Sequence, residues 1–222
     1  MRGTDGALQT GSLSARDLPV HFPGVNLLLR TTLWLGAVVL VAAPAARTQT
    51  QQPGPRAHDG FWVGFSAGTG SARTFCDACT SNPWIRSSVS SLKLGGTPNQ
   101  NLRIGAAIDA WGRSAGGYSE IEGNFTFSLY YYPSTTKGLY LTGGLGAAQY
   151  IYRTSPQVYG IGVGLTGGAG YDVPLGRHIF LTPCVVYTWG NVGNVEDQQT
   201  YETVAANWKQ EFVSLEVGVS YH

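Results

Sequence analysis

The stretch Phe212-Val213-Ser214-Leu215-Glu216-Val217-Gly218-Val219-Ser220-Tyr221 alternates strictly along most of its length between apolar side chains and small or polar ones. Because successive side chains of a strand point to opposite faces, its odd-numbered residues form one apolar face. A segment of this length, about ten residues, is enough for a tilted strand to cross a bilayer. Lipid offers no partner to an unpaired strand edge, so the rest of the chain is expected to close a barrel around this strand.

The composition indicates that water is not the only solvent of this chain. Of 222 residues, 31 are Gly, 12 are Tyr and 6 are Trp, and only 12% are charged, whereas soluble domains usually carry about a quarter charged residues. The formal net charge of +1 speaks against a nucleic-acid partner, which requires a basic patch or stripe. Three cysteines and one methionine are too few for a disulfide scaffold or a metal-rich site, and we expect no cofactor.

Three segments precede the alternating pattern. Residues 1–25 show no useful period and receive no predicted structure. Residues 26–46 place Arg30 before an apolar run and a small-residue exit at Ala43-Pro44-Ala45, which is the order of a secretory signal peptide. A membrane-spanning helix is the alternative, but the apolar run is about half of the roughly 20 residues that a span needs. Residues 47–59 form a polar leader that contains proline.

Residues 60–222 repeat the period of two and predict an all-β domain of eight antiparallel strands in an up-and-down barrel. The apolar faces begin at Phe61, Leu92, Leu102, Ile121, Leu139, Ile161, Ile179 and Val213. Tight links rich in Pro, Gly and Asn follow the second, fourth and sixth strands, and longer loops are expected at 74–85 and 190–207. This asymmetry is typical of outer-membrane barrels, with the short turns in the periplasm. Pro183 lies inside the seventh strand and predicts a bulge, because proline donates no ladder hydrogen bond.

A soluble barrel of the lipocalin kind would alternate as well, so the polar face has to decide between the two. That face consists mostly of Gly, Ser, Thr and Ala with few charges, which suits a crowded lumen better than a surface in water. The other face is almost wholly apolar and carries aromatic residues near the strand ends, where the interfacial girdles of a membrane barrel belong. The sequence therefore predicts a transmembrane β-barrel.

The eight strands, the Gly168-Ala169-Gly170-Tyr171-Asp172 stretch and the terminal strand resemble the outer membrane beta-barrel domain family, which includes the barrel of outer membrane protein A. The resemblance covers about residues 60 to 222 as a pattern rather than as residue identity. It implies a bacterial outer-membrane location, lipid around the barrel, a monomer, and insertion by the barrel-assembly machinery. Members of the family typically end in an aromatic residue that this machinery reads, whereas here His222 follows Tyr221.

Two short motifs permit more than one interpretation. The G-x-G-x-x-G at 162–167 matches a dinucleotide fingerprint, but that fingerprint must end a strand and open a helix, and here it lies within a predicted strand. Cys76-Asp77-Ala78-Cys79 permits a redox pair, half of a zinc site or a local disulfide. We expect the disulfide between Cys76 and Cys79, because the envelope is an oxidising compartment, with Cys184 left as a buried thiol.

Charged residues on the predicted inward face form the strongest chemical constellation: Lys93, Arg103, Asp109, Glu122 and Glu216. Charges in a narrow lumen must pair or be hydrated, so we expect one structural network, and a path for protons or ions is the alternative. An eight-stranded barrel is filled by its own side chains, which argues against an open pore.

The sequence leaves two classes of function open. The first is a non-enzymatic barrel that supports the envelope or presents external loops to a surface, partner or ligand, with small-solute or ion permeation as a variant. The second is a lipid-modifying barrel enzyme, which needs a nucleophile beside a base. No histidine shares a predicted strand face with a serine near the outer leaflet, so we expect no catalytic residues.

Overall fold

The structure is a computed structural model, and it describes residues 60–80 and 82–222. The predicted extension, signal peptide and leader at 1–25, 26–46 and 47–59 lie outside the described residues. Every regular element of these described residues is a strand: β1 (Gly60–Phe75), β2 (Ile85–Asn99), β3 (Leu102–Ala115), β4 (Tyr118–Tyr131), β5 (Leu139–Arg153), β6 (Val158–Tyr171), β7 (Val173–Pro174), β8 (Ile179–Asp197) and β9 (Thr203–Tyr221). Within residues 60–80 and 82–222, there is no helix with the length and hydropathy needed to cross a membrane.

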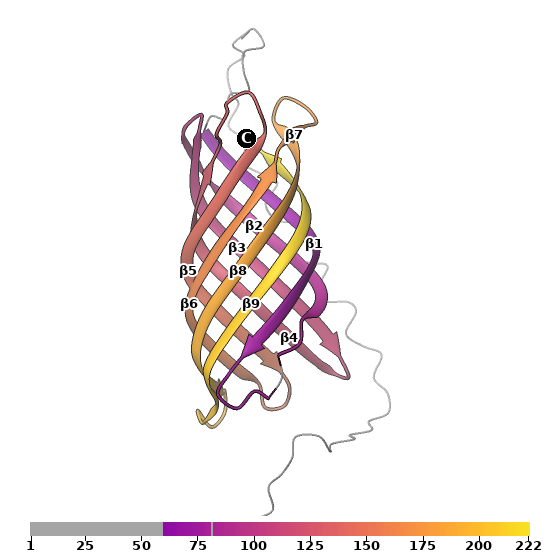
Figure 1. Cartoon of the computed structure of the whole chain (residues 1–222), viewed down its shortest axis with the longest axis vertical. Coiled ribbons are helices and arrows are strands. Elements are labelled where there is room, and N and C mark those ends of the chain that lie inside the picture. Colours follow the sequence, from indigo (N-terminus) through magenta and orange to yellow (C-terminus); the bar gives the residue numbers. More distant parts are fainter. Residues whose placement is uncertain (1–59, 81) are drawn as a thin grey trace, which may run out of the picture. The chain divides into compact units, whose positions relative to one another are not determined.

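The strands close into one barrel in chain order (Figure 1). Each long strand pairs antiparallel with its neighbours, β6 pairs with β8, and β9 pairs back with β1 from Val63↔Tyr221 to Phe75↔Lys209. No strand edge is left open around the ring, which satisfies the main requirement of a sheet in lipid. The predicted eight-stranded antiparallel barrel is confirmed.

The short β7 explains the place of Pro183 in β8. The bulge predicted at Pro183 is wrong, because Pro183 pairs with Val217 of β9 without a shift in register. On its other side, the pairs Gly170↔Cys184 and Val173↔Leu181 keep one register, so the break between β6 and β7 falls opposite Pro183. Proline has no N–H to donate, and the ladder is interrupted at that point instead of being displaced.

The links at the two ends of the barrel differ from the predicted loops. We call the end with Gly60 and Tyr221 the terminal end, and the end with the links 76–84, 116–117, 154–157 and 198–202 the loop end. The loop predicted at 190–207 is wrong, because β8 and β9 continue as a hairpin to a five-residue link, with register shifts between Asn191 and Glu196. Gly116 and Gly117 make a two-residue turn with φ of 57° and 86°, a conformation that glycine adopts without steric cost.

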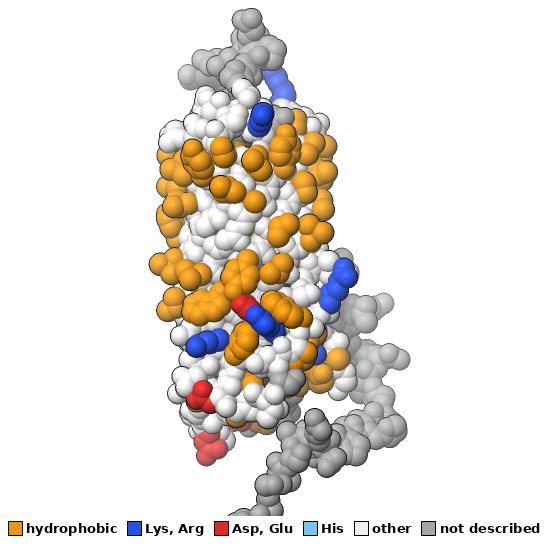
Figure 2. All heavy atoms as spheres, viewed as in Figure 1, with side chains coloured by type: hydrophobic (Ala, Val, Ile, Leu, Met, Phe, Trp, Pro, Cys, Tyr) orange, Lys and Arg blue, Asp and Glu red, His pale blue; other side chains and the backbone are white. Residues whose placement is uncertain are grey.

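Exposed apolar side chains lie on every long strand and form a belt around the outside of the barrel. Figure 2 shows one face of this belt. On β9, Leu215 is 59% exposed, while its neighbours Ser214 and Glu216 are 1% and 0% exposed. The eight residue steps from Val213 to Tyr221 rise about 3.3 Å each, which at a tilt of about 40° gives roughly 20 Å of height and approaches the belt of a membrane barrel. The alternation of faces thus places the apolar residues toward lipid and the polar ones inside.

Candidate functional site

The lumen near the terminal end is blocked by four aromatic side chains, which we call the aromatic plug: Trp62, Tyr130, Tyr132 and Tyr140. All four are buried. The ring centroids of Trp62 and Tyr130 are 5.0 Å apart, and Tyr140 lies 5.8 Å from Tyr130 and 5.5 Å from Tyr132. Aromatic rings in these edge and tilted arrangements pack favourably and cover a large area. Large side chains from three strands therefore occupy the cross-section of the barrel.

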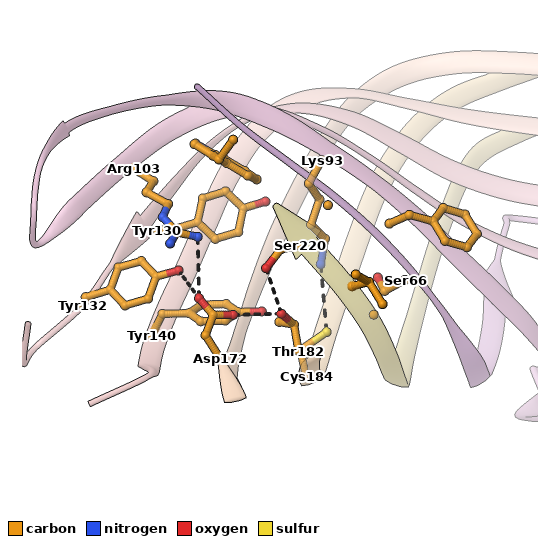
Figure 3. A pocket seen from close by; sticks show the side chains of 15 residues that line it. Ser66, Lys93, Arg103, Tyr130, Tyr132, Tyr140, Asp172, Thr182, Cys184 and Ser220 are labelled. Atoms are coloured by element: carbon orange, nitrogen blue, oxygen red, sulfur yellow. Dashed lines mark hydrogen bonds and ion pairs between the residues drawn. The ribbon is translucent and has the colours of Figure 1, made fainter. Parts of the chain in front are cut away.

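An ion pair lies within the plug (Figure 3). Arg103 Nη1 of β3 is 3.5 Å from Asp172 Oδ2, which follows β6, and both side chains are almost completely buried. The guanidinium also lies 4.7 Å from the ring centroid of Tyr132. Asp172 accepts hydrogen bonds of 2.8 Å from the Tyr132 hydroxyl and from Thr182 Oγ1. Each charge thus has a counter-ion or a polar partner in a space with little water.

His222 completes this end of the lumen. Its Nε2 lies 2.6 Å from Arg103 Nη2. A guanidinium can only donate, so Nε2 accepts and the proton of the neutral ring is on Nδ1. The imidazole stacks on Phe180 with centroids 4.0 Å apart and an interplanar angle of 9°. The His222 side chain therefore turns into the barrel, while Tyr221 faces outward and is 52% exposed.

A small cavity lies beside the plug. It has a volume of about 30 Å³ and is lined in part by Ser66, Lys93, Cys184 and Ser220 (Figure 3). The Lys93 Nζ atom lies 3.9 Å from the Cys184 sulfur. A space of this size holds about one water molecule, so it cannot admit a drug-sized ligand, which needs about 300 Å³ or more.

Glu216 is held by hydroxyl groups. Ser66, Ser91 and Ser214 donate to its carboxylate at 2.6, 2.8 and 2.6 Å. These serines come from β1, β2 and β9, and Glu216 itself is fully buried. Hydrogen bonds to a charged group are stronger than those between neutral groups, so this carboxylate is stabilised by donors rather than by a cation in contact with it.

The five predicted lumen charges are all buried inside the barrel, at 9% exposure or less, but they do not pair with one another. Among the described residues, the salt bridges are Arg73–Glu211, Arg103–Asp172 and Arg113–Glu120. Asp109 Oδ2 lies 3.5 Å from Thr166 Oγ1, and one oxygen of Glu122 accepts no hydrogen bond from the described residues. The expected single ion-pair network is therefore divided into separate polar groups.

Ion pairs between adjacent strands were predicted from the sequence, but the Arg103–Asp172 contact crosses the lumen. Arg103 lies on β3 and Asp172 lies at the end of β6, with β4 and β5 between them in the sheet. Asp172 shares the inward parity of Gly168 and Gly170, so that parity could have identified it. Glu120 was missed as well: it faces Arg113 directly across β3 and β4, with Arg113 Nε 2.5 Å from its Oε2, and it accepts a 2.9 Å hydrogen bond from Tyr150.

The rest of the lumen is also filled. Trp111 and Phe212 are buried with Val89 and Ala72, and nearer the loop end Tyr150 packs on Trp208 at a centroid distance of 4.4 Å. Small residues make room for these contacts. The G-x-G-x-x-G stretch lies inside β6, and a Cβ on its Gly164 would stand 2.6 Å from the Asn124 amide nitrogen. At this position glycine allows a side chain from β4 to approach the strand.

The β1–β2 link is tied to the start of β9. Cys76 and Cys79 form a disulfide within it, and Cys184 is a free, buried thiol. The Asp77 backbone N–H donates to the Ala206 carbonyl at 3.3 Å, and Asn207 Nδ2 donates to Asp77 Oδ2 at 2.6 Å. At the loop end, the disulfide-bonded β1–β2 link is thus held against the β8–β9 hairpin.

Comparison with known proteins reveals likeness in structure rather than in sequence. No protein-family model matches the chain, and no curated protein matches it. The attachment invasion locus protein of Yersinia pestis matches with a TM-score of 0.50 at 11% identity, over 73% of this chain and 99% of that one. Neisserial surface protein A matches with a TM-score of 0.49 at 16% identity, over 72% and 96%. The protease OmpT of Escherichia coli matches with a TM-score of 0.33 at 12% identity, over 74% and 97%.

Likeness at these identities extends to the architecture alone, since one fold supports many functions. The closed ring of strands and the apolar belt are observations on this chain itself, and they are the attributes of barrels that span the outer membrane of bacteria. The chain is an eight-stranded outer-membrane β-barrel.

Proposed function

We propose that this protein is a non-enzymatic integral outer-membrane barrel with a closed lumen, whose loop end is available for interaction with a surface or ligand and which contributes to envelope integrity. The observation that carries the proposal is the aromatic plug with its buried Arg103–Asp172 pair. A conducting path would have to displace both the rings and an ion pair that lies in a space with little water, at a cost of about 3 to 5 kcal/mol for the pair alone.

The positions of the histidines support a non-enzymatic role. An acyl-transfer or hydrolytic site needs a nucleophile with an adjacent base. His178 Nδ1 lies 3.0 Å from the His222 backbone oxygen, and the His222 ring is engaged by Arg103 and Phe180. Both histidines of the described chain lie at the terminal end, with the short turns that are predicted to lie in the periplasm. They are therefore far from an outer-leaflet substrate.

The loop end supports an interaction role. β8 and β9 are the longest strands, at 19 residues each, and their outer parts continue past the apolar belt as a paired hairpin. The β1–β2 link is fastened to this hairpin through Asp77 and Asn207. Such an ordered surface loses little conformational entropy when a partner binds.

We propose that the barrel is a monomer in lipid and is inserted by the barrel-assembly machinery.

The test is conductance of the refolded protein in planar bilayers, with an open porin as the positive control. We expect no steady current from the wild type, nor from Glu122→Ala or Arg103→Ala in the fraction that folds. A stable, ion-selective current from the wild type would contradict the closed lumen and favour permeation. The same preparation is incubated with labelled lipid A, and release of a fatty acid would contradict the non-enzymatic role.

A further inference from the structure

Three cations run diagonally across the outside of the barrel near the loop end, and we call them the basic rim: Arg86 of β2, Arg73 of β1 and Lys209 of β9. The sheet register pairs Ser71 with Arg86, Arg73 with Glu211, and Phe75 with Lys209. From β2 to β1 to β9, each cation therefore lies one outward-facing position nearer the loop end than the cation on the preceding strand. Diagonal neighbours of this kind lie about 7–8 Å apart, so the three charges act on the same small area of surface.

The basic rim carries more positive charge than the adjacent acid can balance. Glu211 forms an ion pair with Arg73 and also accepts a hydrogen bond from the Tyr187 hydroxyl. Arg86 donates from Nε to Thr69 Oγ1 at 3.0 Å. Neither Arg86 nor Lys209 takes part in a salt bridge within residues 60–80 and 82–222, and both are exposed. Two positive charges therefore remain for a partner outside the chain.

Aromatic side chains hold the central cation in place. The Arg73 guanidinium lies 4.4 Å from the Trp84 ring centroid and 4.8 Å from that of Phe75. Trp84 and Tyr187 are 47% and 43% exposed. Amphipathic rings at this height are the interfacial girdle of a membrane barrel. A guanidinium stacked in this way is positioned in advance and loses little freedom on binding an anion.

The height of the basic rim places it where lipid headgroups lie. On β9, Glu211 directly precedes the lipid-facing positions Val213 and Leu215, which are 42% and 59% exposed. In Figure 2, Lys and Arg side chains gather along the lower margin of the apolar belt, on the side of the loop end. Since the short turns at the terminal end are predicted to lie in the periplasm, this margin belongs to the outer leaflet.

From this arrangement we infer that the basic rim binds the phosphate groups of a phosphorylated outer-leaflet lipid of the lipid A class. Arg and Lys are the side chains that recognise phosphate, Arg through its planar fork and Lys as a point charge. The apolar belt next to the basic rim, toward the middle of the membrane, accepts the acyl chains of the same molecule. The inference rests on the membrane orientation used in the proposed function, but not on closure of the lumen.

The test is a titration of fluorescent lipid A with both phosphates into the full barrel in a zwitterionic detergent. The rim variant is Arg86→Gln with Lys209→Gln, and the control is Lys137→Gln with Arg177→Gln, two exposed cations in links at the terminal end. Both variants lose the same charge. Each cation near an anionic surface contributes about fivefold in affinity. The rim variant loses two cations, so we expect it to bind about 25-fold more weakly and the control to bind like the wild type.

Lipid A without phosphates provides the second arm. For this phosphate-free lipid A, we expect the wild type and the rim variant to have the same affinity. Equal binding by the wild type and the rim variant, an equal loss in the control, or equal affinity of the wild type for the two lipids would each overturn the inference. Heat-modifiable migration and bilayer conductance of the same samples report folding and closure independently. If the double variant does not fold, Lys209→Gln alone is measured, with Lys137→Gln as its control.

Discussion

Arg103 Nη1 lies 3.5 Å from Asp172 Oδ2 although two strands separate β3 from β6 in the sheet. The contact passes through the interior of the barrel instead of along its wall. It joins two parts of the ring that no backbone hydrogen bond connects, and the aromatic plug surrounds it. The most buried ion pair of the described chain therefore braces the barrel from within.

The first prediction concerns this pair. Asp172→Asn keeps the shape of the side chain but leaves Arg103 without its counter-ion, and we expect the free energy of unfolding to fall by about 3 to 5 kcal/mol. Urea unfolding in lipid vesicles measures it, with Glu202→Gln in the exposed β8–β9 link as the control. Adding Arg103→Met should restore part of the loss, because both charges are then gone. A single variant as stable as the control would contradict the bracing role.

The second prediction concerns the Glu216 carboxylate. Ser91→Ala removes one of its three donors, and we expect a loss of about 1.5 to 3 kcal/mol, the usual contribution of a hydrogen bond to a charged group. Ser90→Ala is the matched control, because Ser90 is the exposed neighbour on the same strand. If the two variants unfold at the same urea concentration, the hydroxyl cluster is not important for stability.

The third prediction tests which face meets lipid. Leu215→Arg puts a charge in the belt and should destabilise the barrel by about 2 to 4 kcal/mol. Tyr201→Arg, in the link beyond the belt, is the control, since Tyr201 is 72% exposed at the loop end. Refolding yields and urea midpoints in vesicles give both values. Equal tolerance of the two charges would mean that the belt does not lie in the bilayer.

The fourth prediction concerns Cys76 and Cys79. We expect protein isolated from the envelope to carry them bonded to each other, so the peptide should take up iodoacetamide only after reduction. Cys76→Ser with Cys79→Ser should leave barrel stability nearly unchanged, because the link lies outside the sheet, and should speed proteolysis of residues 76–84. Two thiols that react before reduction would show that no bond forms in the cell.

The strand pattern could be predicted from the sequence because the pleat imposes a period of two on every residue. The same parity places Trp62 with Gly64 and Ser66 on the inward face, so the position of the plug was available in principle. Its contacts were not, since aromatic residues occur both in girdles and in lumens, and only the packing of Trp62 against Tyr130 decides between them. The partner of Arg103 depends on the stagger of tilted strands around the ring, which local pattern does not record.

The extent of the β8–β9 hairpin was missed for a related reason. Residues 190–207 include Gly190, Gly193, Asn194 and Asn207, which are usual in loops, and the register shifts there interrupt the alternation. The backbone nevertheless remains paired, with Gly193 and Asn207 at positive φ. Irregular pairing of this kind hides a strand from any method that depends on a regular period.

The pairing of β1 with β9 has a consequence for how the molecule is made. These strands are the first and last of the barrel, and their ladder runs from Val63↔Tyr221 to Phe75↔Lys209. A chain still emerging from the ribosome or translocon has one of the two without its mate, and the exposed edge is prone to aggregation. Closure must also bring together residues that are distant in sequence, which makes it slow. The outer edge of β1 therefore stays unpaired until β9, the last strand to be made, is available to close the ring.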